Sequence, residues 1–370
     1  MAVIDLHSKP FDDSTIAKLE IFEDYAKAWI PTFVMQRRPE IHVFDFFAGT
    51  GFDINGVKGS PIRLLDKIIG QVGNIFTKRV KVIVHFNEFE PKKKAQKKFK
   101  LLEKTCKQYL IDHKDLARAI DLRLYNEDCE TLFPTLLPLI RKFPALVYLD
   151  QNGIKFLSDV YFLELEKLSE TDFLYFVSSS YFWRFGDREE FSNHFKIDLD
   201  EAKSNPYKFI HKQVLEELKN RLPSDSKLRL YPYSLRKGPN IHGIIFGASH
   251  PRAVDKFLSI AWKRNKLNGE ANFDINDDRD KHQPTLFGTQ KTKLQIFEED
   301  VELAVLSCQI ENNFDMYGYT IDRGHIGTHS ASVLRKLRKL KKIDYPGTSP
   351  LVTYDNVHKN NKFVKYKKIT

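Results

Sequence analysis

An acidic residue and a paired-glycine turn follow an apolar run near the start of the chain. The stretch 43–51 reads Val-Phe-Asp-Phe-Phe-Ala-Gly-Thr-Gly, with the acid at Asp45 and the glycines at Gly49 and Gly51. A near-continuous apolar run is typical of a strand buried on both faces. A Gly-x-Gly turn lets the backbone approach a ligand more closely than any Cβ allows. This combination predicts a strand that ends at a nucleotide-like ligand.

Three later apolar runs also end in acid-containing turns. The acids are Glu88, Asp128 and Asp150, and they follow the runs 80–86, 121–125 and 145–149. Helical segments separate the runs, and this alternation predicts a parallel, doubly wound sheet whose strand ends meet at one edge. Ligands bind at that edge, where an acid such as Glu88 accepts hydrogen bonds from both hydroxyls of a ribose. The alternative role for Asp128 is a helix cap, since Asp is a common N-cap residue.

The other elements of this region follow from spacing and turn residues. Apolar residues recur at three- and four-residue intervals between 14 and 33, which predicts an amphipathic helix that is capped near Ser14 and ends at Pro31. Pro61 favours the start of a helix that runs to Ile69. Further predicted elements are helices over 158–168 and 207–222, strands over 173–177, 228–234 and 241–248, and an insertion or lid near 186–205. The last two strands form a hairpin, which gives the sheet an antiparallel edge.

These ordered motifs resemble those of the class I S-adenosylmethionine-dependent methyltransferases. The motifs are Asp45-x-Phe47-Ala48-Gly49-x-Gly51, Glu88-x-x-Pro91, Asn126-Glu127-Asp128 and Asp150. Over most of residues 14–265 the chain also resembles the three-Cys-motif partner proteins, known as the TcmP family. The segments that carry this second likeness are the aromatic helix 18–29, Gly59-Ser60-Pro61, the aromatic end of 173–185, and 242–250 with the helix that holds Trp262. The resemblance implies a Rossmann-like methyltransferase fold with S-adenosylmethionine as its cofactor.

The resemblance also implies which residues bind that cofactor. They are Asp45, Phe47, Ala48, Gly49, Gly51, Glu88, Asp128 and Cys129. Asp45 and the glycine turn would lie against the methionine moiety, and Glu88 would bind the ribose. Asp128 would meet the adenine amino group, with Cys129 beside it.

The residues after the fourth strand depart from the patterns of these families. The chain has Asp150-Gln151-Asn152-Gly153, whereas the partner-protein family shows Asp-Pro-Phe-Gly and base amino-methyltransferases show Asn/Asp-Pro-Pro followed by an aromatic residue. Asp150 keeps the acid that accepts a hydrogen bond from an amine or orients a nucleophile, and Gln151 and Asn152 offer amide groups. These three residues are the catalytic candidates. The alternative is a fold that binds the cofactor without transferring a methyl group.

Aromatic and basic side chains near the predicted sheet edge could contact a nucleic acid. The turn 178–185 places Trp183 next to Arg184, and base stacking on an aromatic residue is worth ~1–3 kcal/mol. The alternative is that these aromatics pack under the next segment. Lys92 and Lys93 begin a lysine-rich stretch, for which the alternative is a solvated helix face.

A separate basic domain is predicted to follow the methyltransferase-like domain of residues 1–266. Residues 267–295 are poor in apolar side chains and form a linker. The elements predicted within 296–370 are helices over 297–310 and 328–340 and strands over 351–354 and 363–366. This is the order of a winged-helix-like α+β domain, whose second helix enters a major groove. The residues that would contact nucleic acid are Arg335, Lys336, Arg338, Lys339 and Lys342. Winged helices also serve as protein-binding modules.

The composition limits the kinds of partner and the cellular compartment that we expect for this protein. The formal net charge of +10 favours polyanions, nucleic acid first. The three cysteines, Cys106, Cys129 and Cys308, form no CxxC pair, so we expect neither a disulfide framework nor a metal site, and they fit a reducing cytosol. No run reaches the ~18 apolar residues that a membrane span needs. We therefore expect a cytoplasmic protein without a membrane partner.

The sequence as a whole predicts an S-adenosylmethionine-binding methyltransferase that acts on DNA or RNA. The family resemblance adds a phage-related or defence operon as context and a separate three-Cys-motif protein as a partner. One alternative is a non-catalytic, nucleic-acid-binding partner protein that uses the methyltransferase fold as a scaffold. The other is an enzyme that uses a different adenosine-containing cofactor.

Overall fold

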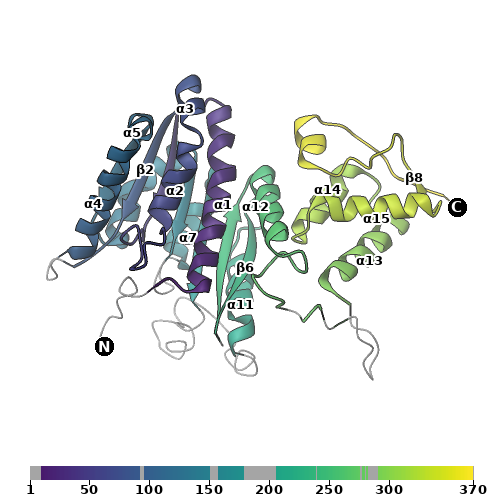
Figure 1. Cartoon of the computed structure of the whole chain (residues 1–370). Coiled ribbons are helices and arrows are strands. Elements are labelled where there is room, and N and C mark those ends of the chain that lie inside the picture. Colours follow the sequence, from purple (N-terminus) through teal and green to yellow (C-terminus); the bar gives the residue numbers. More distant parts are fainter. Residues whose placement is uncertain are drawn as a thin grey trace. The chain divides into compact units, whose positions relative to one another are not determined.

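A computed structural model describes residues 10–91, 96–150, 157–178, 206–238, 240–275, 277–279, 281 and 291–369. The chain divides into two compact units, Met1–His250 and Pro251–Thr370. We call them unit 1 and unit 2 and describe each by itself. Unit 1 contains the predicted ligand-binding edge, and unit 2 contains the predicted basic domain (Figure 1).

Unit 1 is built on a seven-stranded sheet with the strand order β3-β2-β1-β4-β5-β7-β6. The strands are β1 Glu40–Asp45, β2 Lys81–Asn87, β3 Ile120–Tyr125, β4 Ala145–Leu149, β5 Thr171–Ser178, β6 Arg229–Lys237 and β7 Asn240–Ala248. The first five strands are parallel, and β7 lies antiparallel between β5 and β6. This order, with one antiparallel strand inserted next to the edge, is that of the Rossmann-like methyltransferase sheet. The predicted fold class and hairpin edge are confirmed.

Helices cover both faces of this sheet. They are α1 Asp13–Met35, α2 Ser60–Ile69, α3 Val72–Lys78, α4 Lys97–Asp112, α5 Lys114–Ala119, α6 Cys129–Lys142, α7 Asp159–Glu166 and α11 Pro206–Asn220. On one face, Phe44 of β1 and Phe46 just after it pack with residues of α6, α7 and α11 in one hydrophobic core. Because side chains alternate along a strand, Val43 and Asp45 point to the other face, where α1 and α2 lie side by side (Figure 1). The short helices α3 and α5 are additional to the predicted elements.

Helix α1 is longer than predicted at its C-terminal end. The predicted end at Pro31 is wrong, because Pro31 lies inside the helix, which continues to Met35. A proline in a helix removes one backbone hydrogen bond, but Ile30 and Val34 are fully buried on either side of it, so packing holds the last turn in place. At the other end the cap is Asp12, whose carboxylate accepts from Thr15 N at 2.8 Å.

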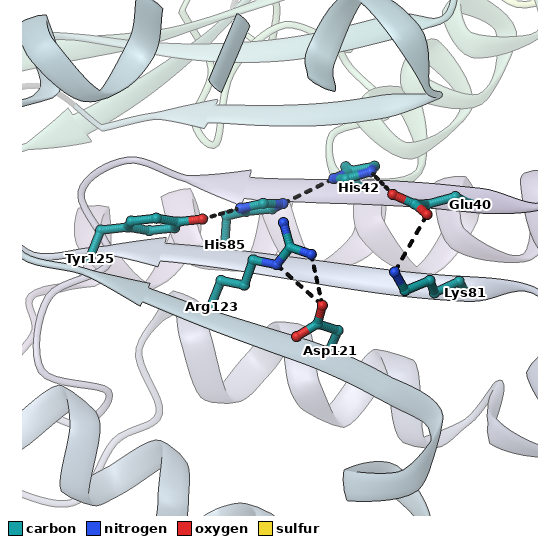
Figure 2. Close-up of polar contacts among 7 residues, drawn as sticks. All are labelled: Glu40, His42, Lys81, His85, Asp121, Arg123 and Tyr125. Atoms are coloured by element: carbon teal, nitrogen blue, oxygen red, sulfur yellow. Dashed lines mark hydrogen bonds and ion pairs between the residues drawn. The ribbon is translucent and has the colours of Figure 1, made fainter. Parts of the chain in front are cut away.

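A chain of hydrogen bonds crosses β1, β2 and β3 on one face of the sheet (Figure 2). Its four members are Glu40, His42, His85 and Tyr125, and consecutive members are 2.8, 2.9 and 3.0 Å apart. A carboxylate only accepts, so Glu40 fixes the proton of His42 on Nε2. The neutral tautomers then follow: His85 Nε2 donates to His42 Nδ1, and the Tyr125 hydroxyl donates to His85 Nδ1. In this arrangement every ring nitrogen of the two buried imidazoles has a partner while both are neutral.

Unit 2 is a small helical domain with a short antiparallel ribbon. Its elements are α12 Pro251–Arg264, α13 Lys293–Leu306, α14 Asn313–Asp322, α15 Gly327–Lys339, β8 Ile343–Asp344, the π-turn Asp355–Lys359, and β9 Lys367–Lys368. The predicted ribbon strands at 351–354 and 363–366 are wrong, since β8 pairs with β9. The apolar residues that suggested those strands, such as Val352 and Val364, are buried inside unit 2. The bridge between Asn312 and Lys365 extends the ribbon toward α14.

The start of unit 2 differs from the predicted domain limit of residue 266. Helix α12 belongs to this unit because Trp262 Nε1 donates to Gly324 O at 2.8 Å and its ring packs on His329. The described part of the predicted linker is also compact. Asn268 is fully buried, and its carbonyl oxygen accepts from Lys293 Nζ at 2.8 Å. The side chains of Asn265 and Asn268 also bond to backbone atoms between residues 267 and 273, which orders a stretch with few apolar residues.

Candidate functional site

Three of the four predicted acids converge at the carboxyl edge of the sheet. Asp45 is the last residue of β1, Glu88 directly follows β2, and Asp150 directly follows β4. The charges of Asp150 and Glu88 both act on Asp45 and raise its pKa, so the three carboxyl groups share one neighbourhood. The parallel order β2-β1-β4 explains this, since adjacent parallel strands end at the same edge.

The glycine turn connects the ends of β1 and β2. Gly49 N donates to Glu88 Oε2 at 2.9 Å, and Ala48 N donates to Asn87 O at the same distance. Gly49 and Gly51 have φ values of +70° and +95°, which side chains other than glycine rarely adopt. A Cβ on Gly51 would also lie only 2.7 Å from Thr105 Cγ2. The turn therefore requires glycine at both predicted positions.

Asp45 lies at the centre of this edge and is almost fully buried. Its carboxylate accepts from Ser60 Oγ at 2.6 Å and from Phe47 N at 3.1 Å. Burial, together with the charges of Asp150 and Glu88, raises the pKa of Asp45 to about 7 despite these two hydrogen bonds. A carboxyl group that titrates near neutral pH is suited to a cationic ligand, which stabilises its charged form.

Asp128 and Cys129 lie at the start of α6. Asp128 is exposed, and its carboxylate caps the helix by accepting from Glu130 N at 3.0 Å. The helix cap that was its alternative role in the sequence is therefore present. The Cys129 thiol is buried in the core, and burial raises its pKa, which keeps it protonated. The predicted contact of these two residues with adenine stays a prediction.

Lys18 is a site residue that the sequence reasoning missed. It lies on α1 and forms an ion pair with Asp150, while its ammonium group stands 4.3 Å from the centre of the Phe176 ring. The two side chains of the ion pair are 11% and 22% exposed, so the pair is largely desolvated. One signal was present: Lys18 lies four residues before Phe22 and seven before Tyr25, at the helical spacing of the apolar face of α1.

Tyr148 adds a buried hydroxyl group to the same face. It pairs in register with Asp45 across β1 and β4, and its ring stacks on Phe22 of α1 at 4.2 Å. Its hydroxyl has no hydrogen-bond partner within the part of the chain that the structure describes. Burial raises its pKa, and the charges of Asp150 and Asp45 raise it further. Tyr148 therefore stays protonated beside the acids.

Several predicted site residues lie outside the described residues. They are Gln151, Asn152, Lys92, Lys93, Trp183 and Arg184, together with the predicted insertion near 186–205. The described residues contain no cluster of three or more side chains that could hold a metal ion. Among the described helices, none has the length and apolar character that a membrane crossing requires.

The basic residues of α15 and its C-terminal end in unit 2 fall into two groups. Arg335, Lys336 and Lys339 are exposed on the helix. Arg338 instead binds Asp344 at 3.1 Å and stacks on Tyr345, and Lys342 binds Glu302 at 2.7 Å. Two of these five basic side chains, which were predicted to contact nucleic acid, therefore form ion pairs within unit 2 itself.

Comparison with known proteins adds little to this geometry. No family model matches the chain, and no curated protein matches it. Among solved structures, the chain is similar to the O-methyltransferase TomG from Streptomyces achromogenes, which takes part in tomaymycin synthesis and was solved in complex with S-adenosylmethionine. The identity is 12%, with 66% of this chain and 92% of that chain covered and a TM-score of 0.30. The fold is assigned from the strand order of the sheet.

Proposed function

We propose that unit 1 binds S-adenosylmethionine at the carboxyl edge of β1, β2 and β4. The observation that carries this proposal is the convergence of Asp45, Glu88 and Asp150 around a turn that requires glycine, on a methyltransferase-type sheet. The ligand carries a sulfonium and an ammonium group, and opposite charges attract strongly where water is excluded. The acidic edge therefore favours this cofactor over a nucleotide whose phosphates are negative.

Glu88, Asp45 and the glycine turn contact different parts of the cofactor in this proposal. Glu88 holds the ribose hydroxyls with the carboxylate that also accepts from Gly49 N, since a carboxylate has room for several donors. Asp45 lies nearest the methionine ammonium group, and the glycine turn allows the backbone to approach the ligand. The bound cofactor would supply an activated methyl group, so the chain contributes mainly by placing the acceptor in line with it.

We propose a nucleic acid as the methyl acceptor. Support comes from the net charge of +10 and from the exposed Arg335, Lys336 and Lys339 on α15, which follows α14 after a short turn. Helix, turn, helix and antiparallel ribbon follow one another as in a winged helix, whose second helix enters the major groove. A cytoplasmic location, a defence or phage-related operon and a three-Cys-motif partner protein belong to this proposal through the family resemblance.

One observation favours a second candidate function. The Asp150 carboxylate is already paired with Lys18, which leaves it less able to orient an acceptor. In this alternative, unit 1 binds the cofactor without transferring its methyl group, and the protein acts as a nucleic-acid-binding partner.

Transfer of a radiolabelled methyl group to total DNA and total RNA tests the two candidates. The first predicts label in one of the two nucleic acids, and the label disappears in Asp150→Ala while cofactor binding persists. Cofactor binding with no label in either pool supports the second candidate. Replacement of Arg335, Lys336 and Lys339 by alanine is expected to weaken nucleic-acid binding and to reduce its salt dependence. Lys342→Ala is the control and should have a smaller effect, since Lys342 is paired with Glu302.

A further inference from the structure

The strand β3 lies at one end of the sheet and has an outer edge. Within the described part of the chain, β2 is its strand neighbour on one side and no strand pairs with its other side. All six of its residues are only partly buried. An edge strand with an open row of backbone groups is a template for pairing with another chain.

The backbone of β3 presents a defined set of groups to this outer edge. Tyr125 O accepts from Glu88 N and therefore points toward β2. Backbone groups of successive residues in a strand point to opposite sides, so Arg123 and Asp121 also direct theirs to β2. The residues whose N–H and C=O groups face outward are Ile120, Leu122 and Leu124.

The side chains of β3 are complementary to those of a second copy of β3 that is related to it by a two-fold axis. Asp121 and Arg123 lie on one face of the strand (Figure 2), 41% and 37% exposed, and they form an ion pair of 2.9 Å with each other. Antiparallel pairing of two copies centred on Leu122 places Asp121 of each copy opposite Arg123 of the other. The same register sets Ile120 against Leu124 on the other face.

This register also agrees with the backbone geometry. Leu122, as an outward-facing residue at the centre, forms a hydrogen-bonded pair with its own copy, and the two strands exchange about six backbone hydrogen bonds. Asp121 and Arg123 then occupy non-hydrogen-bonded pairs, in which facing side chains approach most closely. Centring on Arg123 would place the two Arg123 side chains, which carry like charges, opposite each other in a non-hydrogen-bonded pair. Charges on an edge strand usually hinder pairing, but Asp121 and Arg123 hinder the two-fold arrangement centred on Leu122 less than any other register.

We propose that two copies of this chain associate through antiparallel pairing of their β3 edges, centred on Leu122. We assign a second copy of the chain to this edge because an antiparallel copy runs in the reverse direction. Asp121 of each copy then faces Arg123 of the other, so opposite charges meet at both positions. This pairing joins the two seven-stranded sheets into one continuous sheet. It uses the outer side of β3 and not the carboxyl ends of β1, β2 and β4, so it is separate from the proposed cofactor site.

Sedimentation equilibrium of the full chain tests the proposal, at a salt concentration where the net charge of +10 is screened. The expected result is a concentration-dependent dimer. Arg123→Asp should weaken association by about tenfold or more, because it places like charges opposite each other at two positions. The double variant Asp121→Arg with Arg123→Asp reverses both charges and should restore the dimer.

A backbone variant provides an independent arm of the same experiment. Leu122→Pro removes an outward-facing N–H, a substitution that edge strands tolerate, and it should abolish the dimer while the circular dichroism spectrum stays native. If that variant unfolds, the charge-reversal series alone decides. A protein that stays monomeric at every concentration overturns the proposal. A dimer that Arg123→Asp does not weaken, or that the double variant does not restore, also overturns it.

Discussion

Gly49 N donates a hydrogen bond of 2.9 Å to Glu88 Oε2. This bond connects the glycine turn after β1 with the acid that follows β2, two features that lie 39 residues apart in the chain. It holds the turn in the conformation that its positive φ values require. The same carboxylate is the proposed ribose ligand, so the shape of the turn and the affinity for the cofactor depend on one side chain.

Glu88→Gln should weaken binding of S-adenosylmethionine by ~10- to 100-fold, because a hydrogen bond to a charged group is worth ~1.5–3 kcal/mol. The amide oxygen of Gln still accepts from Gly49 N, so the fold is retained. Glu103→Gln on α4, where Glu103 pairs with Lys107 at the surface, is the matched control and should bind normally. Equal affinity of Glu88→Gln and the wild type in a calorimetric titration would contradict the ribose assignment.

Asp45 makes the stability of unit 1 fall as the pH rises. Its folded-state pKa of about 7 is above its unfolded value of ~3.9, so the folded state binds more protons between these values. The stabilisation is complete below about pH 4 and is lost as the pH rises through about 7. Urea unfolding across this range should show that Asp45→Asn gains stability relative to the wild type with rising pH. A constant difference at all pH values would show that Asp45 does not titrate there.

The His42 and His85 pair has the opposite pH dependence. Burial lowers the pKa of both imidazoles, that of His85 to about 3, whereas the unfolded value is ~6.5. The unfolded state binds more protons below about pH 6.5, so stability is present above that pH and is lost as the pH falls toward 3. Lys81, Asp121 and Arg123 also face this pair (Figure 2).

His85→Gln cannot gain the proton and should flatten the acid side of the stability curve between about pH 4 and about pH 6.5. The substitution His250→Gln, at an exposed histidine of the same unit, serves as the control. Chemical denaturation at several pH values measures the effect. An unchanged acid slope in His85→Gln would mean that other groups cause the acid sensitivity.

Lys18 and Asp150 should be energetically coupled, because their ion pair is largely buried. Removing one partner leaves the other group without its hydrogen bond in a largely buried place, so Lys18→Met and Asp150→Asn should each destabilise the protein by ~1–3 kcal/mol. The double variant should lose less than the sum of the two. The exposed pair Lys107 and Glu103 should couple by only ~0.3–0.5 kcal/mol in the same double-mutant cycle. Additive losses of stability for Lys18→Met and Asp150→Asn would show that the ion pair has no coupling energy.

The local patterns of the sequence were sufficient to predict the acidic edge of the sheet and its glycine turn. An apolar run, an acid and a glycine turn are consecutive in the chain, so Asp45, Gly49 and Gly51 could be recognised from neighbouring residues alone. Glu88 followed from the order of parallel strands, and the structure places it against Gly49 as that order requires.

The features that the sequence did not reveal depend on contacts between distant residues. Lys18 is 132 residues from Asp150, and a lysine inside an apolar helix face has no partner that spacing can identify. Pro31 was expected to end α1, but packing around Ile30 and Val34 overrides the local preference. In unit 2, the apolar residues between 351 and 366 have the sequence pattern of strands but are buried without forming them. The ribbon forms instead from β8 and β9, two short segments whose sequences show little apolar alternation.

Isothermal calorimetry of the full chain with S-adenosylmethionine tests the central claim most directly. The account predicts one bound equivalent and a heat that differs between two buffers of unequal ionisation enthalpy near neutral pH. The cationic ligand would lower the pKa of Asp45 from about 7 and so release a proton to the buffer. The absence of binding by both S-adenosylmethionine and S-adenosylhomocysteine would contradict the account.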